Sequence, residues 1–175
     1  MSLRIVLLMA AFIVVTQAHA DKWDYTTDAD KMTGKTLTKA SIASSNSLNL
    51  SFPYAGDNYG FLTVRKHPQY GLHVIVHITK GQILCPSYGG CSVKVRFGNG
   101  QPLTFSAAGA DDQSANVLFI HNAQKFIDLA KKTTSIKVQI NIYQAGGQVL
   151  EFDGPSPLVW GQGQGKTNQL RSKEK

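Results

Sequence analysis

The two cysteines of this chain lie close together, on either side of five residues in the stretch CPSYGGC, residues 85–91. Paired cysteines form a disulfide, hold a metal or act as a redox pair. A structural zinc site would need two more ligands, and a thioredoxin-like redox pair has two intervening residues rather than five. The spacing therefore favours a disulfide between Cys85 and Cys91, provided that the compartment is oxidising.

The histidines are the next candidates for chemistry. His73 and His77 would share one face of a strand, but four residues of strand separate them by about 13 Å, too far for one metal ion to bridge. A site that also used His67 and His121 would need contacts between strands. We predict no metal site and no cofactor, with His73 and His77 facing solvent.

Acidic and hydroxyl side chains give no catalytic pattern. Asp111-Asp112 with Ser114 could serve acid–base chemistry, but paired acids before an apolar run are typical of a turn. The serines do not lie in a G-x-S-x-G or S-x-x-K motif. We predict no catalytic residues and a protein that is not an enzyme; the alternative is a hydrolase that uses histidine and aspartate in a cleft.

Basic side chains do not form a nucleic-acid site. Lys94 and Arg96 would share a strand face opposite the apolar Val93 and Val95, and aromatic residues do not alternate with them as a stacking platform requires. We interpret them as a solvated strand face, and we expect no nucleic-acid partner.

The first twenty residues predict the compartment. A short basic start, an apolar run over residues 5–15 and the ending Ala18-His19-Ala20 are typical of a secretory signal peptide, residues 1–20. The apolar run is too short to span a bilayer. We expect a periplasmic or secreted protein without an integral membrane segment after signal removal.

The remaining chain predicts one domain and a tail. Residues 21–160 are long enough for a single β-rich domain with its own core. Residues 161–175 contain one aliphatic side chain, Leu170, and four of the chain's Lys and Arg residues against one acid. Such a composition predicts a disordered basic tail.

Most of the domain follows a period of two, which is typical of half-buried strands. The predicted strands cover residues 48–52, 59–66, 72–78, 91–97, 103–106, 136–142 and 149–152. Gly98-Asn99-Gly100 and Gly146-Gly147 predict hairpin turns. Residues 31–47 are rich in threonine and serine and fit either a helix face or a loop.

One segment changes to a helical period. Asn122 could cap a helix whose apolar residues Phe126, Ile127, Leu129 and Ala130 fall on one face. The fold class is therefore mainly β: an antiparallel β-sandwich or partly open barrel with one covering α-helix near residues 122–132.

The cysteine loop is the predicted binding site. We expect it to be a hairpin tip that ends one strand at Leu84 and begins the next at Cys91. Ser87, Tyr88, Gly89 and Gly90 would then be presented with little conformational entropy to lose on binding. The alternative is that Tyr88 packs back onto the sheet.

The run from Cys91 to Asp153 resembles small exported, uncharacterised bacterial β-rich proteins. Its V-x-V-R-F strand, D-x-S turn, L-F-I strand and F-x-x-x-A-K helix follow the same order. The chain is also distantly similar to accessory proteins of type VI secretion loci. The resemblance covers roughly residues 72–160 and implies a β-rich periplasmic domain.

These patterns together favour a periplasmic or secreted, non-enzymatic binding module that engages a protein partner at the cell envelope. The alternative is an inhibitor or immunity-type protein that blocks a cell-wall hydrolase such as lysozyme through the Cys85–Cys91 loop.

Overall fold

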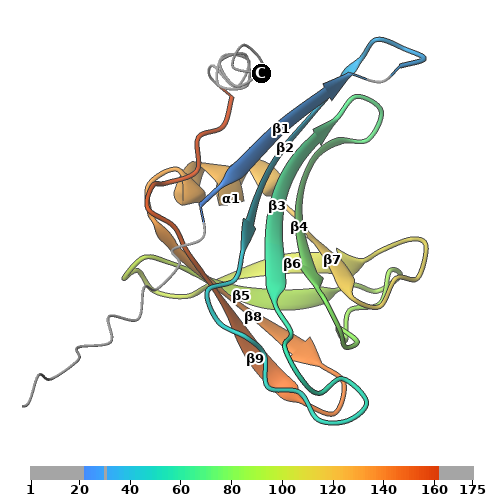
Figure 1. The fold of residues 1–175 in the computed structure, drawn as a ribbon, viewed down its shortest axis with the longest axis vertical. Coiled ribbons are helices and arrows are strands. Elements are labelled where there is room, and N and C mark those ends of the chain that lie inside the picture. Colours follow the sequence, from blue (N-terminus) through green and yellow to red (C-terminus); the bar gives the residue numbers. More distant parts are fainter. Residues whose placement is uncertain (1–21, 30, 162–175) are drawn as a thin grey trace, which may run out of the picture.

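The computed structural model describes residues 22–29 and 31–161, which contain nine strands and one helix (Figure 1). The predicted signal peptide, residues 1–20, and nearly all of the predicted tail lie outside the described residues. In chain order the elements are β1 (Asp24–Ala29), β2 (Thr36–Ala43), β3 (Gly60–His67), β4 (Gly71–Ile78), β5 (Cys91–Phe97), β6 (Leu103–Gly109), β7 (Val117–Ile120), α1 (Ala123–Ala130), β8 (Ser135–Ile142) and β9 (Gly146–Asp153).

All nine strands belong to one antiparallel sheet, in the order β1-β2-β3-β4-β7-β6-β5-β8-β9. The sheet is strongly curved, so that β1–β4 rise on one side of the molecule while β8 and β9 run across the other (Figure 1). It does not close into a barrel, because β1 and β9 are its two edges. The prediction of a mainly β fold with one helix is confirmed.

One face of the curved sheet forms the core. In β4 the side chains of Val74, Val76 and Ile78 are fully buried, and the alternating His73, Ile75 and His77 are only half-buried. The same alternation runs through β3, β5, β8 and β9. Burial of alternate apolar side chains removes them from water and fixes the register of each strand.

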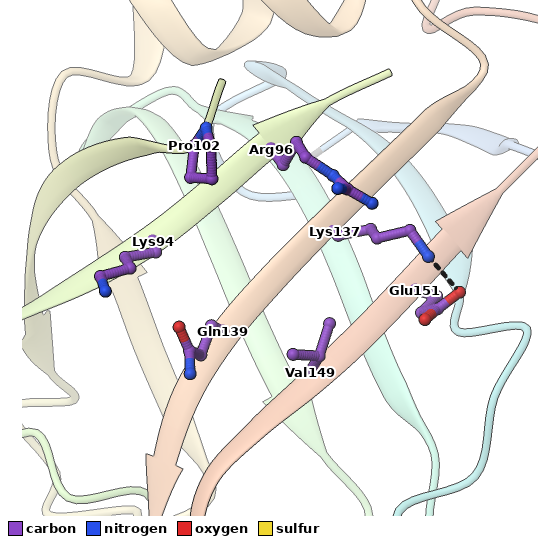
Figure 2. A pocket seen from close by; sticks show the side chains of 7 residues that line it. All are labelled: Lys94, Arg96, Pro102, Lys137, Gln139, Val149 and Glu151. Atoms are coloured by element: carbon purple, nitrogen blue, oxygen red, sulfur yellow. Dashed lines mark ion pairs between the residues drawn. The ribbon is translucent and has the colours of Figure 1, made fainter. Parts of the chain in front are cut away.

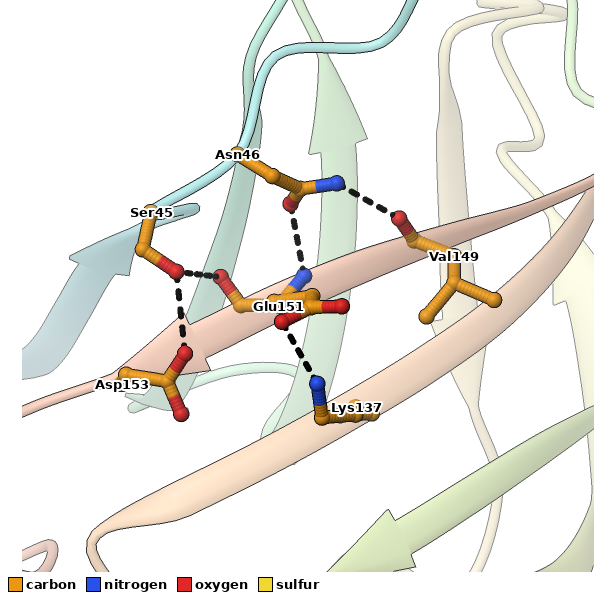
Figure 3. Close-up of polar contacts among 6 residues, drawn as sticks. All are labelled: Ser45, Asn46, Lys137, Val149, Glu151 and Asp153. Atoms are coloured by element: carbon orange, nitrogen blue, oxygen red, sulfur yellow. Dashed lines mark hydrogen bonds and ion pairs between the residues drawn. The ribbon is translucent and has the colours of Figure 1, made fainter.

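The chain after β2 ties the two halves of the sheet together (Figure 3). The backbone N–H of Ser45 donates to the carbonyl oxygen of Glu151 at 2.7 Å. The side chain of Asn46 donates to the carbonyl of Val149 at 2.9 Å and accepts from the N–H of Glu151 at 2.8 Å. Ser45 and Asn46 therefore occupy outward-facing hydrogen-bonding groups in the middle of β9.

The core between the halves is closed by a contact at the start of β3. A Cβ atom on Gly60 would lie 2.5 Å from the side chain of Leu150 on β9. A larger residue at position 60 would require the Leu150 side chain to shift.

The helix covers the core beside β5 and β6. Phe126, Ile127 and Ala130 are fully buried, and the ring of Phe126 packs edge-on against Phe97 at 5.1 Å and Phe105 at 5.8 Å between centroids. The predicted helix is confirmed over residues 123–130.

Its predicted cap is wrong. Asn122 does stand at the N-cap position, but with φ 57° and without a side-chain hydrogen bond to the helix. This left-handed backbone is not the extended conformation from which a cap side chain normally reaches the first N–H groups.

Two further segments differ from the sequence predictions. Residues 36–43 form β2, within the segment 31–47 that fits a helix face or a loop by sequence, and residues 24–29 form β1, for which the sequence predicts no element. Residues 48–52, predicted as a strand, have no strand pairing, although Leu48 and Leu50 are buried.

Candidate functional site

Cys85 and Cys91 are joined by a disulfide, with their Cα atoms 5.1 Å apart. Cys85 is buried and Cys91 begins β5. The predicted pairing is confirmed.

The loop is not the tip of a hairpin, and that prediction is wrong. β4 ends at Ile78, and β7 and β6 lie between β4 and β5 in the sheet. The chain from Thr79 to Gly90 is irregular and makes a single bridge, between Ile83 and Ile142 of β8. The loop is therefore part of a long connection that runs past the ends of β6, β7 and β8.

Two glycines let the loop lie directly against β6. A Cβ on Gly109 would stand 2.2 Å from the carbonyl oxygen of Cys85, and one on Gly90 would stand 2.6 Å from the carbonyl oxygen of Ala107. The N–H of Gly109 also donates to the carbonyl of Pro86 at 3.4 Å. The disulfide and these backbone contacts hold both ends of the loop.

The predicted binding residues are at the surface. Ser87, Tyr88 and Gly89 are exposed, and Gly90 is half-buried against β6. The Tyr88 side chain is 86% exposed, so the alternative in which it packs onto the sheet is not the arrangement found.

A groove beside the loop adds apolar surface that the sequence did not reveal. It has a volume of about 580 Å³ and runs between the loop and the turn that follows β6. Leu84, Pro86 and Tyr88 contribute to its wall, and Leu84 is 52% exposed. The sequence predicts that Leu84 ends a strand, and at such a position a leucine would not indicate a contact surface. In the structure Leu84 is not part of a strand.

Replacing Cys91 with serine should lower the free energy of unfolding by about 2 kcal/mol, because the disulfide closes only a short ring and so restricts the unfolded chain modestly. Denaturant unfolding of oxidised wild type and of the variant measures this. Reduced wild type is the control and should match Cys91→Ser. A loss several times larger would mean that the loop also organises the core.

A second pocket, of about 570 Å³, lies on the outer face of the sheet beside the loop. Its lining combines basic, acidic and aromatic side chains with a backbone stretch at the end of β6. The residues are Arg65, Tyr70, His73, Ala108, Gly109, Ala110, Asp111, Asp112, Phe119 and His121.

His73 and His77 do not simply face solvent as predicted. The His73 ring lies edge-on to Phe119 at 5.6 Å, and burial followed by the charges of Arg65 and His67 lowers its pKa. The His77 ring stacks on Phe61 at 5.8 Å, and burial lowers its pKa. Both rings are therefore neutral members of the outer face.

The second pocket brings His73 and His121 together with Asp111 and Asp112, the residue types of the hydrolase alternative. Its lining includes no serine, threonine or cysteine that could act as a nucleophile. Asp112 instead accepts the N–H of Ser114 at 3.0 Å, as the predicted turn requires, and hydrogen bonds from Ser114 lower its pKa. Within residues 22–29 and 31–161, no three His, Cys, Asp or Glu side chains are grouped to hold a metal ion.

Lys94 and Arg96 are exposed on the outer face of β5, as predicted. They line a third, shallow pocket of about 340 Å³, with Lys137 and Glu151 on the neighbouring strands (Figure 2). Glu151 pairs with Lys137 at 2.5 Å, so that its carboxylate is already engaged.

The geometry of these surfaces has to be interpreted on its own terms. Comparison of the chain with protein-family models, with curated proteins and with solved structures gave no match.

Proposed function

We propose that this protein is an exported, non-enzymatic binding module that engages a protein partner at the cell envelope through its disulfide-closed loop. The observation that carries the proposal is Tyr88, a large aromatic side chain that is 86% exposed on a loop held at both ends. An isolated exposed tyrosine is common, but one on a constrained loop next to an apolar groove is what an interface anchor requires.

Pre-organisation supports this role. The disulfide and the contacts of Gly90 and Gly109 with neighbouring backbone leave the loop little freedom to lose, which reduces the entropic cost of association. Tyr88 offers apolar area and a hydroxyl group with few rotatable bonds. The exposed Leu84 extends the same surface.

Export is part of the proposal. A structural disulfide persists in oxidising compartments and is rare in the cytosol, so the Cys85–Cys91 bond is compatible with the signal peptide expected over residues 1–20. The helix found in the described residues is too short to cross a bilayer.

Replacing Tyr88 with alanine should weaken partner binding by about 1 kcal/mol or more, roughly fivefold in Kd, while leaving the melting temperature unchanged. Affinity capture from envelope extract with wild-type bait, followed by mass spectrometry, identifies the partner; calorimetry with the purified partner then gives Kd for both proteins. Tyr143→Ala is the matched control, because Tyr143 is 49% exposed on another turn. Equal affinities of wild type and Tyr88→Ala would remove the loop from the interface.

The inhibitor hypothesis predicts a separate effect of Tyr88→Ala, on the inhibition of a cell-wall hydrolase. A protruding, rigid loop suits a concave partner such as the active-site cleft of a cell-wall hydrolase. Wild-type protein should then inhibit lysozyme in a cell-wall turbidity assay, and Tyr88→Ala should inhibit less. Lack of inhibition by wild type, together with a partner that is not a hydrolase, would leave the binding-module proposal alone.

A further inference from the structure

A row of basic side chains crosses the outer face of the sheet. Lys39 on β2 is the register partner of Arg65 on β3, which is in turn the partner of His73 on β4. His121 follows Ile120, the partner of Val74, and so continues the row beside His73. Lys39 and Arg65 are like charges placed directly opposite each other, an arrangement that destabilises a sheet.

Arg65 is the least satisfied member of the row. Its Nη2 donates to Nδ1 of His73 at 3.4 Å, which requires that ring nitrogen to be unprotonated. Its Nε is buried without a hydrogen-bond partner, one of two such buried side-chain atoms among the described residues. Within those residues no carboxylate lies in ion-pair range of the guanidinium. A half-buried cation in this state lacks a counter-ion.

The other unsatisfied atom belongs to the same row. Oγ1 of Thr26, the register partner of Lys39 on β1, is also buried without a partner. The described part of the protein otherwise satisfies its buried side-chain polar atoms, as native structures generally do. Both buried side-chain atoms that lack a hydrogen-bond partner, Oγ1 of Thr26 and Nε of Arg65, therefore lie in this one row across the sheet.

The second pocket opens at the β4–β7 end of this row. Arg65, His73 and His121 stand on one side of it, and Tyr70, which is 62% exposed, lies at its rim. Asp111 and Asp112 line it from the turn between β6 and β7. The same pocket therefore presents hydrogen-bond donors and positive charge from the strands, and carboxylates from the turn.

We propose that this pocket binds a small zwitterionic ligand, an amino acid or a short peptide, whose carboxylate is held by Arg65 and whose ammonium group faces Asp111 and Asp112. A carboxylate supplies the counter-ion that Arg65 lacks and accepts the donors of its guanidinium. A dianion such as phosphate is disfavoured by the acidic turn. The aromatic rings of Tyr70 and Phe119 give the ligand's apolar part a surface to contact. This site is distinct from the loop that carries the proposed function.

Blocked peptides test the proposal without any change in the protein. Calorimetric titration with L-alanyl-L-alanine should show saturable binding. The C-terminal amide and the N-acetyl derivative should each bind at least about tenfold more weakly, since each lacks one of the two charged ends. Equal affinity for all three peptides, or binding of inorganic phosphate as tight as that of the unblocked peptide, would overturn the proposal.

Two variants assign the ends of the ligand. Arg65→Gln should bind the unblocked dipeptide and its amide equally weakly, and Asp111→Asn should no longer distinguish the dipeptide from its N-acetyl form. Arg96→Gln is the matched control, an exposed arginine on β5 away from the pocket, and should bind as wild type does. A loss of affinity in Arg96→Gln equal to that in Arg65→Gln would show general charge attraction and refute the site.

The outcome for this pocket is independent of the loop. Arg65→Gln should leave the affinity for a protein partner unchanged, and Tyr88→Ala should leave dipeptide binding unchanged. Absence of dipeptide binding would therefore refute the pocket proposal alone, and an unchanged partner affinity in Tyr88→Ala would refute the loop proposal alone.

Discussion

Phe126→Ala is expected to lower the free energy of unfolding by about 3–5 kcal/mol, the range for truncating a fully buried phenylalanine. The loss has two parts. The ring leaves a cavity under α1, and the edge-on contacts with Phe97 and Phe105 disappear. Because α1 has two turns and is held mainly by this face, the helix should lose order with the ring.

Denaturant unfolding followed by circular dichroism measures this loss. Phe126→Leu is the control, because it keeps most of the buried volume and should cost less than about 1.5 kcal/mol. If alanine and leucine cost the same small amount, Phe126 would not be the residue through which the helix seals the core.

Asn58→Leu should be the second most damaging substitution considered, at about 3 kcal/mol. Asn58 is fully buried. Its side chain donates to the carbonyl oxygen of Lys80 at 3.0 Å and accepts from the N–H of Lys80 at 3.1 Å and the hydroxyl of Thr79 at 2.8 Å. Leucine has the same branched shape with somewhat more volume, and would leave these groups buried without partners.

The matched control is Asn141→Leu, on the exposed face of β8, which should change stability by less than about 0.5 kcal/mol. Thermal and denaturant unfolding of both variants gives the comparison. A mild effect of Asn58→Leu would mean that water reaches this site and replaces the lost bonds.

Strong alternation allowed several strands to be predicted from sequence. In β4 from Val74 and in β8 from Ile136, every second residue is a buried β-branched side chain, so the pattern follows directly from the packing. β1 lacks such a pattern because it is an edge strand with mostly exposed side chains. β2 buries only Ala40 and Ile42 among threonines and serines, too weak a signal to separate from a loop.

At residues 48–52 the sequence predicts a strand that the structure lacks, because alternate side chains are buried there without strand pairing. Leu48 and Leu50 alternate and are buried as a strand would bury them. Their segment, however, is held by a bond from the N–H of Leu48 to the carbonyl of Asn58 at 2.7 Å rather than by a neighbouring strand. A sequence does not tell a buried, fully bonded asparagine such as Asn58 from an exposed one.

The cysteine spacing predicted the disulfide, but the surroundings of the loop depended on strand order. Because β7 and β6 insert between β4 and β5, the loop belongs to a long connection past the strand ends instead of ending a hairpin. The same insertion places His121 beside His73, and so creates the second pocket from residues that are far apart in the chain. Such cross-strand neighbours follow from topology, which alternation alone does not specify.

The hydrogen bonds that Ser45 and Asn46 make to β9 limit how copies of this protein can associate. Growth of a β-stack by strand addition requires unpaired backbone groups at both ends of each molecule's sheet. Within the described residues, the carbonyl of Val149 and both backbone groups of Glu151 on β9 are occupied by Ser45 and Asn46, which obstructs strand addition there and leaves β1 as the more open edge. Two copies joined β1 to β1 would present only their obstructed β9 edges, so such association ends at a pair and does not propagate into a filament.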